Sequence, residues 1–238
     1  MSPGFAWFKT GAGKKIRSRL DFKFVISEVQ LQKWTVQSNA TNKILHSPPS
    51  WFERLDWAAL FPKRQPVEVD LGCGDGSLLL HWAKRFPDRN WLGVERLKGR
   101  VLKLERKAPR LGIAGNLRAL RIESGYAVEW LFPPASVTAF HIYFPDPWPK
   151  KRHHKYRLVQ PAFVTVLARA LEPGGFVNLA TDHGDYFAEM LACFGANASF
   201  ERVEPLVPAT PEEMTDFERD FATEGRPINR ARFRKVRS

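Results

Sequence analysis

The sequence predicts an α/β fold, a doubly wound and mostly parallel Rossmann-like sheet with helices on both faces. From Pro66 onward, short apolar runs alternate with longer amphipathic segments, which is the pattern of strand and helix units joined by right-handed crossovers. The first of these runs leads directly into a glycine-rich turn, as in folds that bind a ligand at the carboxyl ends of their strands. A hydrophobic content of 44% over 238 residues is enough for one large core.

The elements of this sheet follow one another along the chain. The predicted strands are short segments rich in apolar residues, and in order they are Val67–Leu71, Asn90–Glu95, Leu117–Ile122, Val137–Phe144 and Phe176–Thr181. The predicted helices carry apolar residues three or four positions apart, and they are Ser77–Arg85, Leu97–Lys107, Ala127–Leu131, Leu158–Leu171 and Tyr186–Phe194. The segments Phe200–Leu206 and Arg232–Val236 are expected to complete the sheet as an antiparallel pair.

The first part of the chain has a different character. Residues 1–60 show no steady period and contain scattered glycines and the pair Pro48-Pro49. We therefore expect a basic N-terminal arm, followed by short helical pieces around Trp51 to Leu60. Residues 61–238 are expected to form the α/β domain, which includes a basic C-terminal segment.

The net charge indicates a polyanionic partner. The formal charge is +12, which favours a nucleic acid or an acidic membrane surface over a small metabolite. Three cationic runs contribute to it: Lys9, Lys14, Lys15, Arg17, Arg19 and Lys23 near the start, the segment from Lys150 to Arg157, and Arg226, Arg230, Arg232, Arg234, Lys235 and Arg237 at the end. A single run of this kind is more often a solvated face or a loose terminus, but three separate runs in one chain make that explanation less adequate.

The composition also indicates where in the cell the protein is expected. No apolar run approaches the ~18 residues that span a bilayer, and the N-terminus lacks the core of a signal peptide. Cys73 and Cys193 are too few for a disulfide framework or a zinc cluster. We expect a cytoplasmic protein that uses neither a membrane nor a metal, and the sequence leaves open whether it is a monomer or a homodimer.

The glycine turn that follows the first predicted strand suggests a particular cofactor. In the run V-E-V-D-L-G-C-G-D-G, Asp70 precedes Gly72 and Gly74, and Ser77 stands where a dinucleotide-binding fingerprint has its third glycine. Glu95 ends the second strand, where a carboxylate can accept hydrogen bonds from both ribose hydroxyls. Asp70 suits the ammonium group of a ligand and Glu95 suits an unphosphorylated ribose, and S-adenosylmethionine has both groups. Glycine turns of this kind also occur for purely structural reasons.

A proline-rich corner follows the fourth predicted strand. Pro145, Pro147 and Pro149 fix the backbone around Asp146 and Trp148, and the switch point of the fold places this corner beside the first strand. Trp148 has two equal explanations, stacking on a base or packing beneath the turn. The cations that follow are expected to hold phosphates of a nucleic acid, and these are Lys150, Lys151, Arg152, Lys155 and Arg157. The adjacent His153 and His154 diverge, so a metal site is not expected there.

These motifs together resemble a known family. The blocks F-P-D-P-W-P-K-K-R-H-H-K-Y-R, D-L-G-C-G-D-G, L-G-V-E and A-T-D occur in the order and spacing of the bacterial tRNA (guanine-N7-)-methyltransferases, which are class I S-adenosylmethionine-dependent enzymes. The resemblance covers residues 66–238. It implies methyl transfer from S-adenosylmethionine to N7 of a guanine in tRNA, expected at position 46 of the variable loop.

The resemblance also implies roles for individual residues. Contacts to the cofactor fall on Asp70, Gly72, Gly74, Glu95, Glu123 and Asp146, with Asp146 also catalytic. Contacts to the substrate fall on Lys150 and Asp182, and on Thr215, Phe217 and Glu218 of a threonine-lysine-phenylalanine-glutamate motif. Two positions depart from the family. Asp216 replaces the lysine of that motif and reverses its charge, and Glu123 stands where aspartate is usual.

The chemistry of the reaction agrees with these assignments. Guanine N7 has an in-plane lone pair and no proton, so its attack on a methyl group needs no general base and depends on positioning and electrostatics. Asp146 or Asp182 would stabilise the cationic base that forms, and Glu218 would read the guanine N1-H and N2-H groups. Asp182 is equally suited to capping a following helix, and Glu123 to ending a strand in solvent.

Three alternatives remain open. The same fold could methylate another RNA or a protein nitrogen. A second alternative is a non-catalytic RNA-binding protein on a methyltransferase scaffold, although Asp70, Glu95 and Asp146 are all present. A nicotinamide-dependent oxidoreductase agrees least with the sequence, because of Ser77 and the cationic run.

Overall fold

The computed structural model describes residues 7–9, 15–17 and 43–237. The chain forms two compact units, Met1–Asn39 and Ala40–Ser238. In the first unit, strands β1 (Trp7–Lys9) and β2 (Lys15–Arg17) pair antiparallel. The remainder of the expected basic arm lies outside the described residues, and the functional division expected at residue 61 stays a prediction.

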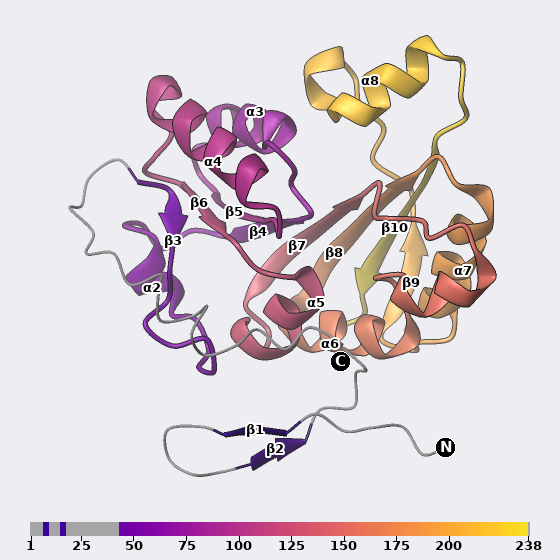
Figure 1. Cartoon of the computed structure of the whole chain (residues 1–238), viewed down its shortest axis with the longest axis horizontal. Coiled ribbons are helices and arrows are strands. Elements are labelled where there is room, and N and C mark those ends of the chain that lie inside the picture. The colour runs from indigo at the N-terminus through magenta and orange to yellow at the C-terminus, as the bar shows by residue number, and fades with distance from the viewer. Residues whose placement is uncertain (1–6, 10–14, 18–42, 238) are drawn as a thin grey trace. The chain divides into compact units, whose positions relative to one another are not determined.

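The second unit is built on an eight-stranded sheet with the order β3-β6-β5-β4-β7-β8-β10-β9 (Figure 1). Its strands are β3 (Leu45–His46), β4 (Val67–Leu71), β5 (Asn90–Val94), β6 (Leu117–Leu120), β7 (Val137–Tyr143), β8 (Leu171–Thr181), β9 (Phe200–Val203) and β10 (Asn229–Lys235). All pairings are parallel except those of β10, which runs antiparallel to both β8 and β9. The predicted doubly wound sheet and its antiparallel end are therefore confirmed.

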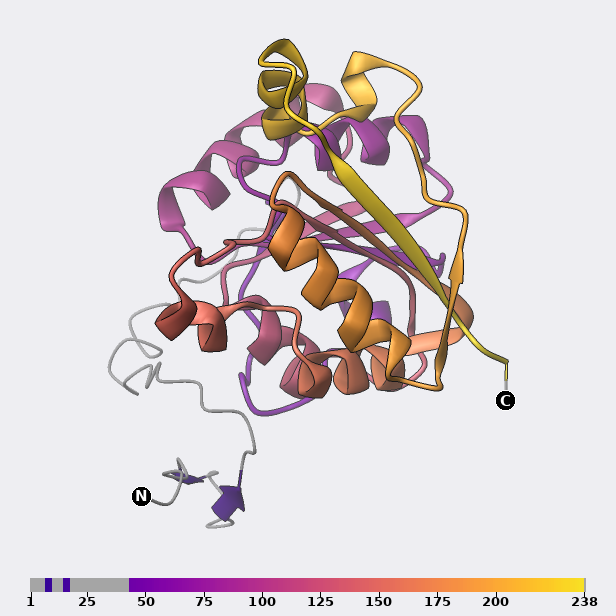
Figure 2. The same cartoon turned by 90° about the vertical axis from the view of Figure 1, so that its right-hand side faces the viewer.

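Helices cover both faces of this sheet (Figures 1 and 2). On one face lie α3 (Ser77–Arg85) and α4 (Lys98–Lys107), whose core is formed by residues such as Leu79, Trp91 and Leu104. On the other face lie α5 (Ser124–Tyr126) with the π-helical turn η2 (Ala127–Leu131), α6 (Pro161–Ala170) and α7 (Gly184–Gly195). A second and larger cluster fills that side.

Several elements differ from the sequence prediction. Helix α6 begins at Pro161 instead of Leu158, because proline has no amide hydrogen to donate and suits the first turn of a helix. The sequence patterns did not reveal the short strand β3, the 3-10 helix η3 (Lys151–Tyr156) or the helix α8 (Asp216–Thr223). The short helix α2 (Trp57–Leu60) lies in the segment where helical pieces were expected, and Asp56 caps it.

Helix α8 begins with a signal that is visible in the sequence. Thr215 accepts a hydrogen bond from the Glu218 amide at 3.0 Å, and Glu218 accepts one from the Thr215 amide at 2.9 Å. This reciprocal pair is a capping box, whose signature is threonine followed three positions later by glutamate. Two residues expected at the substrate therefore also start a helix.

Close packing between α3 and β5 requires a glycine in the middle of β5. A Cβ atom at Gly93 would lie 2.6 Å from Leu79 Cδ2 and 2.7 Å from Cys73 Sγ. Neither neighbour can move away freely, because Leu79 is fully buried and Cys73 belongs to the glycine turn. The contact brings the turn onto the sheet.

We predict that Gly93→Ala lowers the free energy of unfolding by about 1–3 kcal/mol, the usual cost of overpacking a core. Urea denaturation followed by circular dichroism measures this change. Gly99→Ala is the matched control, because a Cβ atom there meets nothing within 4 Å and alanine favours the helix. Equal stability of the two variants would show that the Gly93 contact is not tight in solution.

Candidate active site at the carboxyl edge of the sheet

Five acidic residues gather at the carboxyl edge of the sheet. Strand β4 pairs in parallel with β5 on one side and β7 on the other, and β6 and β8 continue the sheet beyond them. Because parallel strands end at the same edge, the residues at or after their ends lie along one line. These residues are Asp70, Glu95, Glu123, Asp146 and Asp182.

The glycine turn between β4 and α3 has a backbone that other residue types rarely adopt. Gly72, Gly74 and Gly76 have φ angles of 87°, 60° and 79°, and these values are favourable only for glycine. A Cβ atom on Gly72 or Gly74 would meet no protein atom within 4 Å, so the turn presents bare backbone to open space. Such a turn lets a ligand approach the main chain closely.

Glu95 holds this turn from the neighbouring strand. Its Oε2 accepts a hydrogen bond from the Gly74 amide at 3.2 Å, and its Oε1 accepts one from the Leu97 amide at 2.7 Å. Arg100 lies 3.7 Å from the same carboxylate. A carboxylate has about four acceptor positions, so Glu95 retains the capacity to accept hydrogen bonds from a ligand.

Asp70 is the most strongly perturbed acid of the site. It is only 5% exposed, and burial raises its pKa to about 7, with a smaller increase from the charge of Glu95 and an opposing effect of His141. Burial and the carboxylates of Asp70 and Glu95 also raise the pKa of the neighbouring Cys73. A cationic ligand group would stabilise the ionised form of Asp70.

A buried polar network lies beside Asp70. His141 of β7 is the registered neighbour of Asp70, and its Nε2 lies 2.8 Å from Glu68 Oε2. Arg89 pairs with the other oxygen of Glu68. These residues were not predicted from the sequence, although a charged residue within an apolar strand is a visible sign of a buried polar contact.

The proline-rich corner after β7 has a constrained backbone. Phe144 and Trp148 have φ angles of 49° and 45°, which bulky side chains seldom adopt. Trp148 is half-buried and packs against His153 and Tyr156 of η3, with ring centroids 5.9 and 5.3 Å apart. Asp146, between the two constrained residues, is exposed. The corner thus presents a carboxylate on a rigid support.

Arg157 occupies a position that differs from the prediction. Its side chain is 1% exposed, forms an ion pair with Glu189 at 2.6 Å, and lies over the Tyr186 ring. Its Nε donates a hydrogen bond to the Pro147 carbonyl at 2.8 Å. In place of an exposed phosphate contact, the structure shows a buried cation that ties the corner to α7.

The other cations of the two runs divide into two groups. Lys150, Lys151, Arg152 and Lys155 are exposed on or beside η3. Most of the C-terminal cations instead contact the protein itself: Arg226 pairs with Asp182, Arg230 with Glu218 and Arg234 with Glu201, while Lys235 donates to the Leu171 carbonyl and Arg232 lies over the Phe176 ring. Three of these cations are therefore paired with carboxylates, and the other two are held by neutral groups of the protein.

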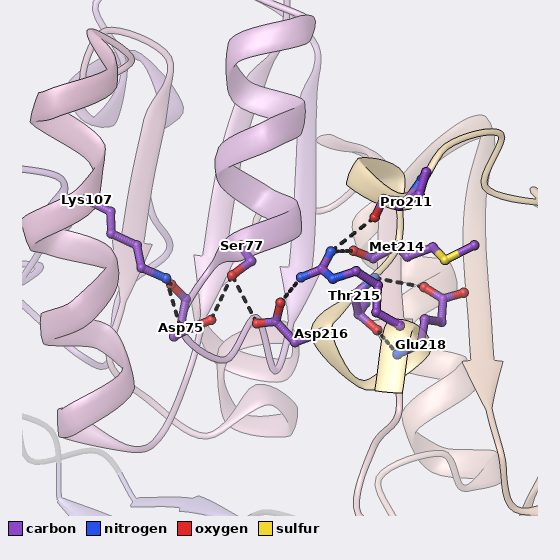
Figure 3. A network of polar contacts seen from close by, with 9 residues as sticks. Asp75, Ser77, Lys107, Pro211, Met214, Thr215, Asp216 and Glu218 are labelled. Atoms are coloured by element: carbon purple, nitrogen blue, oxygen red, sulfur yellow. Dashed lines mark hydrogen bonds and ion pairs between the residues drawn. The ribbon is translucent and has the colours of Figure 1, made fainter. Parts of the chain in front are cut away.

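Helix α8 stands beside the glycine turn and is joined to it by a polar network (Figure 3). The Ser77 hydroxyl lies 3.0 Å from Asp216 Oδ2 and 3.2 Å from Asp75 Oδ1. Lys107 donates to Asp75 at 2.8 Å, and Arg219 pairs with Asp216. These contacts fix the start of α8 against the turn. The negative charge of Asp216 allows it to accept the hydrogen bond from Ser77 and to pair with Arg219.

The motif residues of α8 have separate positions. Phe217 is 47% exposed and packs against Phe144 of the corner, with centroids 6.1 Å apart. Glu218 is buried, and its two oxygens are engaged by the Thr215 amide and by Arg230. Of the three motif residues expected at the substrate, Phe217 is therefore the one that is exposed.

The two remaining acids have contacts that decide between earlier alternatives. Asp182 pairs with Arg226, and the cap of α7 is His183, whose Nδ1 accepts a hydrogen bond from the Tyr186 amide at 3.2 Å. The alternative of Asp182 as that cap is wrong.

Glu123 caps α5 by accepting hydrogen bonds from the amides of Gly125 and Tyr126 at 2.9 and 2.7 Å. It is therefore engaged with the protein and does not simply end a strand in solvent.

Among the described residues, no group of three or more His, Cys, Asp or Glu side chains is arranged to hold a metal ion. Within the same part of the chain, no helix is long and apolar enough to cross a membrane. A cavity of about 500 Å³ lies at the opposite, amino edge of the sheet, between residues such as Leu55, Lys63, Asn90 and Ser136.

Comparisons with known proteins give a consistent result. Residues 64–231 match the model of a family described as "Putative methyltransferase". A tRNA (guanine-N(7)-)-methyltransferase of Halorhodospira halophila is 38% identical over 179 residues, which are 74% of this chain and 77% of the relative. The enzyme of the same description from Nitrosococcus oceani is 34% identical over 76% of each chain.

Solved structures agree on the fold. The 16S rRNA methyltransferase KamB superposes with a TM-score of 0.56 at 20% identity, covering 78% of this chain and 95% of that one. The [4+2]-cyclase SpnF superposes with a TM-score of 0.52 at 14% identity, covering 76% and 79%. Since these two proteins have different chemistry, the likeness shows the architecture alone.

The raised pKa of Asp70 predicts an unusual dependence of stability on pH. Between the usual pKa of a free aspartate and about pH 7, the native state keeps a proton on Asp70 that the unfolded state has lost, so stability should fall as the pH rises to about 7 and level off above it. Relative to Asp70→Asn, the wild type should lose about 2–3 kcal/mol of unfolding free energy between pH 5 and 8. Urea titrations at pH 5 and 8 measure it, and a constant difference would show that Asp70 is ionised throughout.

The buried position of Arg157 predicts a structural cost for its removal. Arg157→Met leaves the Pro147 carbonyl and Glu189 without their partner, and we expect a loss of about 1–3 kcal/mol of unfolding free energy. Arg152→Met, at an exposed position five residues earlier, should change it by less than ~0.5 kcal/mol. Chemical denaturation of both variants provides the test, and an undiminished stability of Arg157→Met would place the guanidinium in solvent.

Proposed function

The chain belongs to the family of tRNA (guanine-N(7)-)-methyltransferases, and we propose that it transfers the methyl group of S-adenosylmethionine to N7 of a guanine in tRNA. The resemblance seen in the sequence motifs is confirmed by these relatives. The observation that carries the mechanism is the exposed Asp146, held on a constrained corner at the same edge as the glycine turn.

The residues around the glycine turn fit S-adenosylmethionine. Open space in front of Gly72 and Gly74 leaves room for the main chain to contact the ligand. Asp70 would bind the cationic end of the amino acid, and Glu95 and Glu123 would accept hydrogen bonds from the ribose and the adenine. The cofactor supplies an activated methyl group on a sulfonium centre.

The transfer itself requires orientation more than proton movement. Guanine N7 carries a lone pair and no proton, so the protein has to align N7 with the methyl carbon and stabilise the positive charge that the base acquires. Asp146 is suited to the second task because its carboxylate is exposed on the corner that follows β7, the strand that pairs with β4. Asp182 is engaged with Arg226, so we assign it to the support of α8 and to the rim of the substrate site.

Helix α8 and η3 are assigned to the substrate. Phe217 is exposed beside the corner and is placed to stack on a base, since aromatic stacking is a common mode of RNA recognition. Thr215 and Glu218 would act through the capping box that presents Phe217. The exposed cations Lys150, Lys151, Arg152 and Lys155 would hold phosphates. Arg157 would support them by fixing the Pro147 carbonyl.

We also propose a specific target base and a location in the cell. The variable-loop guanine at position 46 is the expected target, and that base must leave its tertiary contacts before reaction, at a cost of a few kcal/mol. A cytoplasmic location follows from the substrate, because tRNA is found there. Monomer and homodimer are both compatible with the site.

The direct test uses an unmodified tRNA transcript and methyl-labelled S-adenosylmethionine, with 7-methylguanosine located by borohydride reduction and aniline cleavage. We expect cleavage at one variable-loop guanosine. Asp146→Asn should lower kcat by about 10²–10³, the usual effect of removing one electrostatic contact in the transition state, with tRNA affinity within about threefold of wild type. Label in another base or in ribosomal RNA, with none at guanine N7 of tRNA, would overturn the proposal.

A further inference from the structure

Half of the net charge of this protein lies in one short segment that the cationic runs described above do not include. Between residues 96 and 110 the chain has seven cations and one carboxylate, so its net charge is 7 − 1 = +6, compared with +12 for the whole sequence. The cations are Arg96, Lys98, Arg100, Lys103, Arg106, Lys107 and Arg110. The segment comprises α4 and the start of the 3-10 helix η1 (Ala108–Leu111).

The periodicity of α4 separates these cations from its core. Val101, Leu104 and Ala108 are fully buried against the sheet. Lys103 and Arg106, three residues apart, lie on the exposed side of the helix, as does Arg110 beyond its end. We call the surface formed by Lys103, Arg106 and Arg110 the α4 face. A helix with a charged side of one sign is a site for a partner of the opposite sign.

The only carboxylate in this segment does not neutralise the α4 face. Glu105 turns toward β3, and its two oxygens accept hydrogen bonds from the Ile44 and Leu45 amides at 3.2 and 2.7 Å. The neighbouring Lys107 is committed to Asp75 at 2.8 Å. The charge of Lys103, Arg106 and Arg110 is therefore directed to solvent.

The position of α4 connects this charge to the proposed active site. The helix borders the glycine turn along its length. Arg100 lies 3.7 Å from Glu95, Leu104 packs where a Cβ atom on Gly76 would stand, and Lys107 bonds Asp75. Figure 3 shows this side of the turn, with Lys107 on one flank and Asp216 of α8 on the other. A large polyanion bound at the turn would also reach α4.

We propose that the α4 face binds the phosphate backbone of the tRNA substrate, at a site separate from the cations of η3. The inference rests on the proposed function for the identity of the polyanion. Charge complementarity favours RNA, because each phosphate neutralised by Lys or Arg releases a counterion. A membrane bound on the same helix would compete with tRNA for the approach to the glycine turn, so RNA agrees better with a site that both elements border.

The test compares two triple variants of the full-length protein. In the first, Lys103→Gln, Arg106→Gln and Arg110→Gln remove the α4 face. In the matched control, Lys63→Gln, Arg64→Gln and Lys84→Gln remove the same charge from exposed positions elsewhere in the same unit. The Kd for an unmodified tRNA transcript is measured by filter binding at several salt concentrations, and S-adenosylhomocysteine binding by calorimetry verifies that each variant is folded.

We expect the α4 variant to raise Kd for tRNA at least about tenfold near 0.1 M salt and to reduce the magnitude of the log–log salt slope by about 2–3, since each phosphate contact contributes about 0.7–0.9. The control should keep the wild-type slope within ~0.5. Equal changes in Kd and in the salt slope for the two variants would show that only the net charge matters, and this result would overturn the proposal. So would unchanged tRNA binding accompanied by lost binding to phosphatidylglycerol vesicles.

If the α4 variant fails to bind S-adenosylhomocysteine, the single variants Lys103→Gln and Arg106→Gln replace it, each with an expected slope change of about 0.7–0.9. This experiment is independent of turnover. A wild-type protein that binds tRNA without forming 7-methylguanosine would contradict the proposed function and leave the α4 face testable. A protein that methylates tRNA with an unchanged slope in the α4 variant would contradict the α4 face alone.

Discussion

The parallel pairing of β4 with β5 on one side and β7 on the other is the constraint on which the site depends. Because these strands run in the same direction, Asp70, Glu95 and Asp146 come from distant parts of the chain to one edge of the sheet. The close packing of Gly93 on the glycine turn and the Glu95 hydrogen bonds then hold the turn at that edge. Burial of Asp70 is a consequence of the same arrangement, since a carboxylate on a central strand of a covered sheet has little access to water.

Many of the polar residues of this edge are engaged with the protein's own backbone. Glu95 holds the glycine turn, Glu123 caps α5, Glu218 completes the capping box of α8, and Arg157 binds the Pro147 carbonyl. Such contacts cost little during a reaction because the groups are already oriented. Asp146 differs from them, since it is exposed on a backbone whose conformation is fixed from both sides. The site is therefore a rigid frame around a small number of groups that remain available for ligands.

Most of the fold could be predicted from the sequence, because the strands and helices of the sheet have strong local patterns. Helix α8 was also predictable in principle, because the spacing of Thr215 and Glu218 is a capping-box signature. The roles of individual cations could not be predicted. Arg157 is buried only because Tyr186 and Glu189, on a later helix, surround it. The α4 cations are visible in the sequence, but only the packing of the helix on the sheet shows which of them face solvent.

We propose that one edge of this sheet brings the methyl donor and a tRNA guanine together at Asp146. The most direct measurement is a structure of the protein with S-adenosylhomocysteine and an unmodified tRNA. We predict that the cofactor lies on the glycine turn between Asp70 and Glu95, with its sulfur facing N7 of a variable-loop guanine beside Asp146. A guanine held elsewhere, with no RNA base near the corner formed by residues 144–149, would contradict the account.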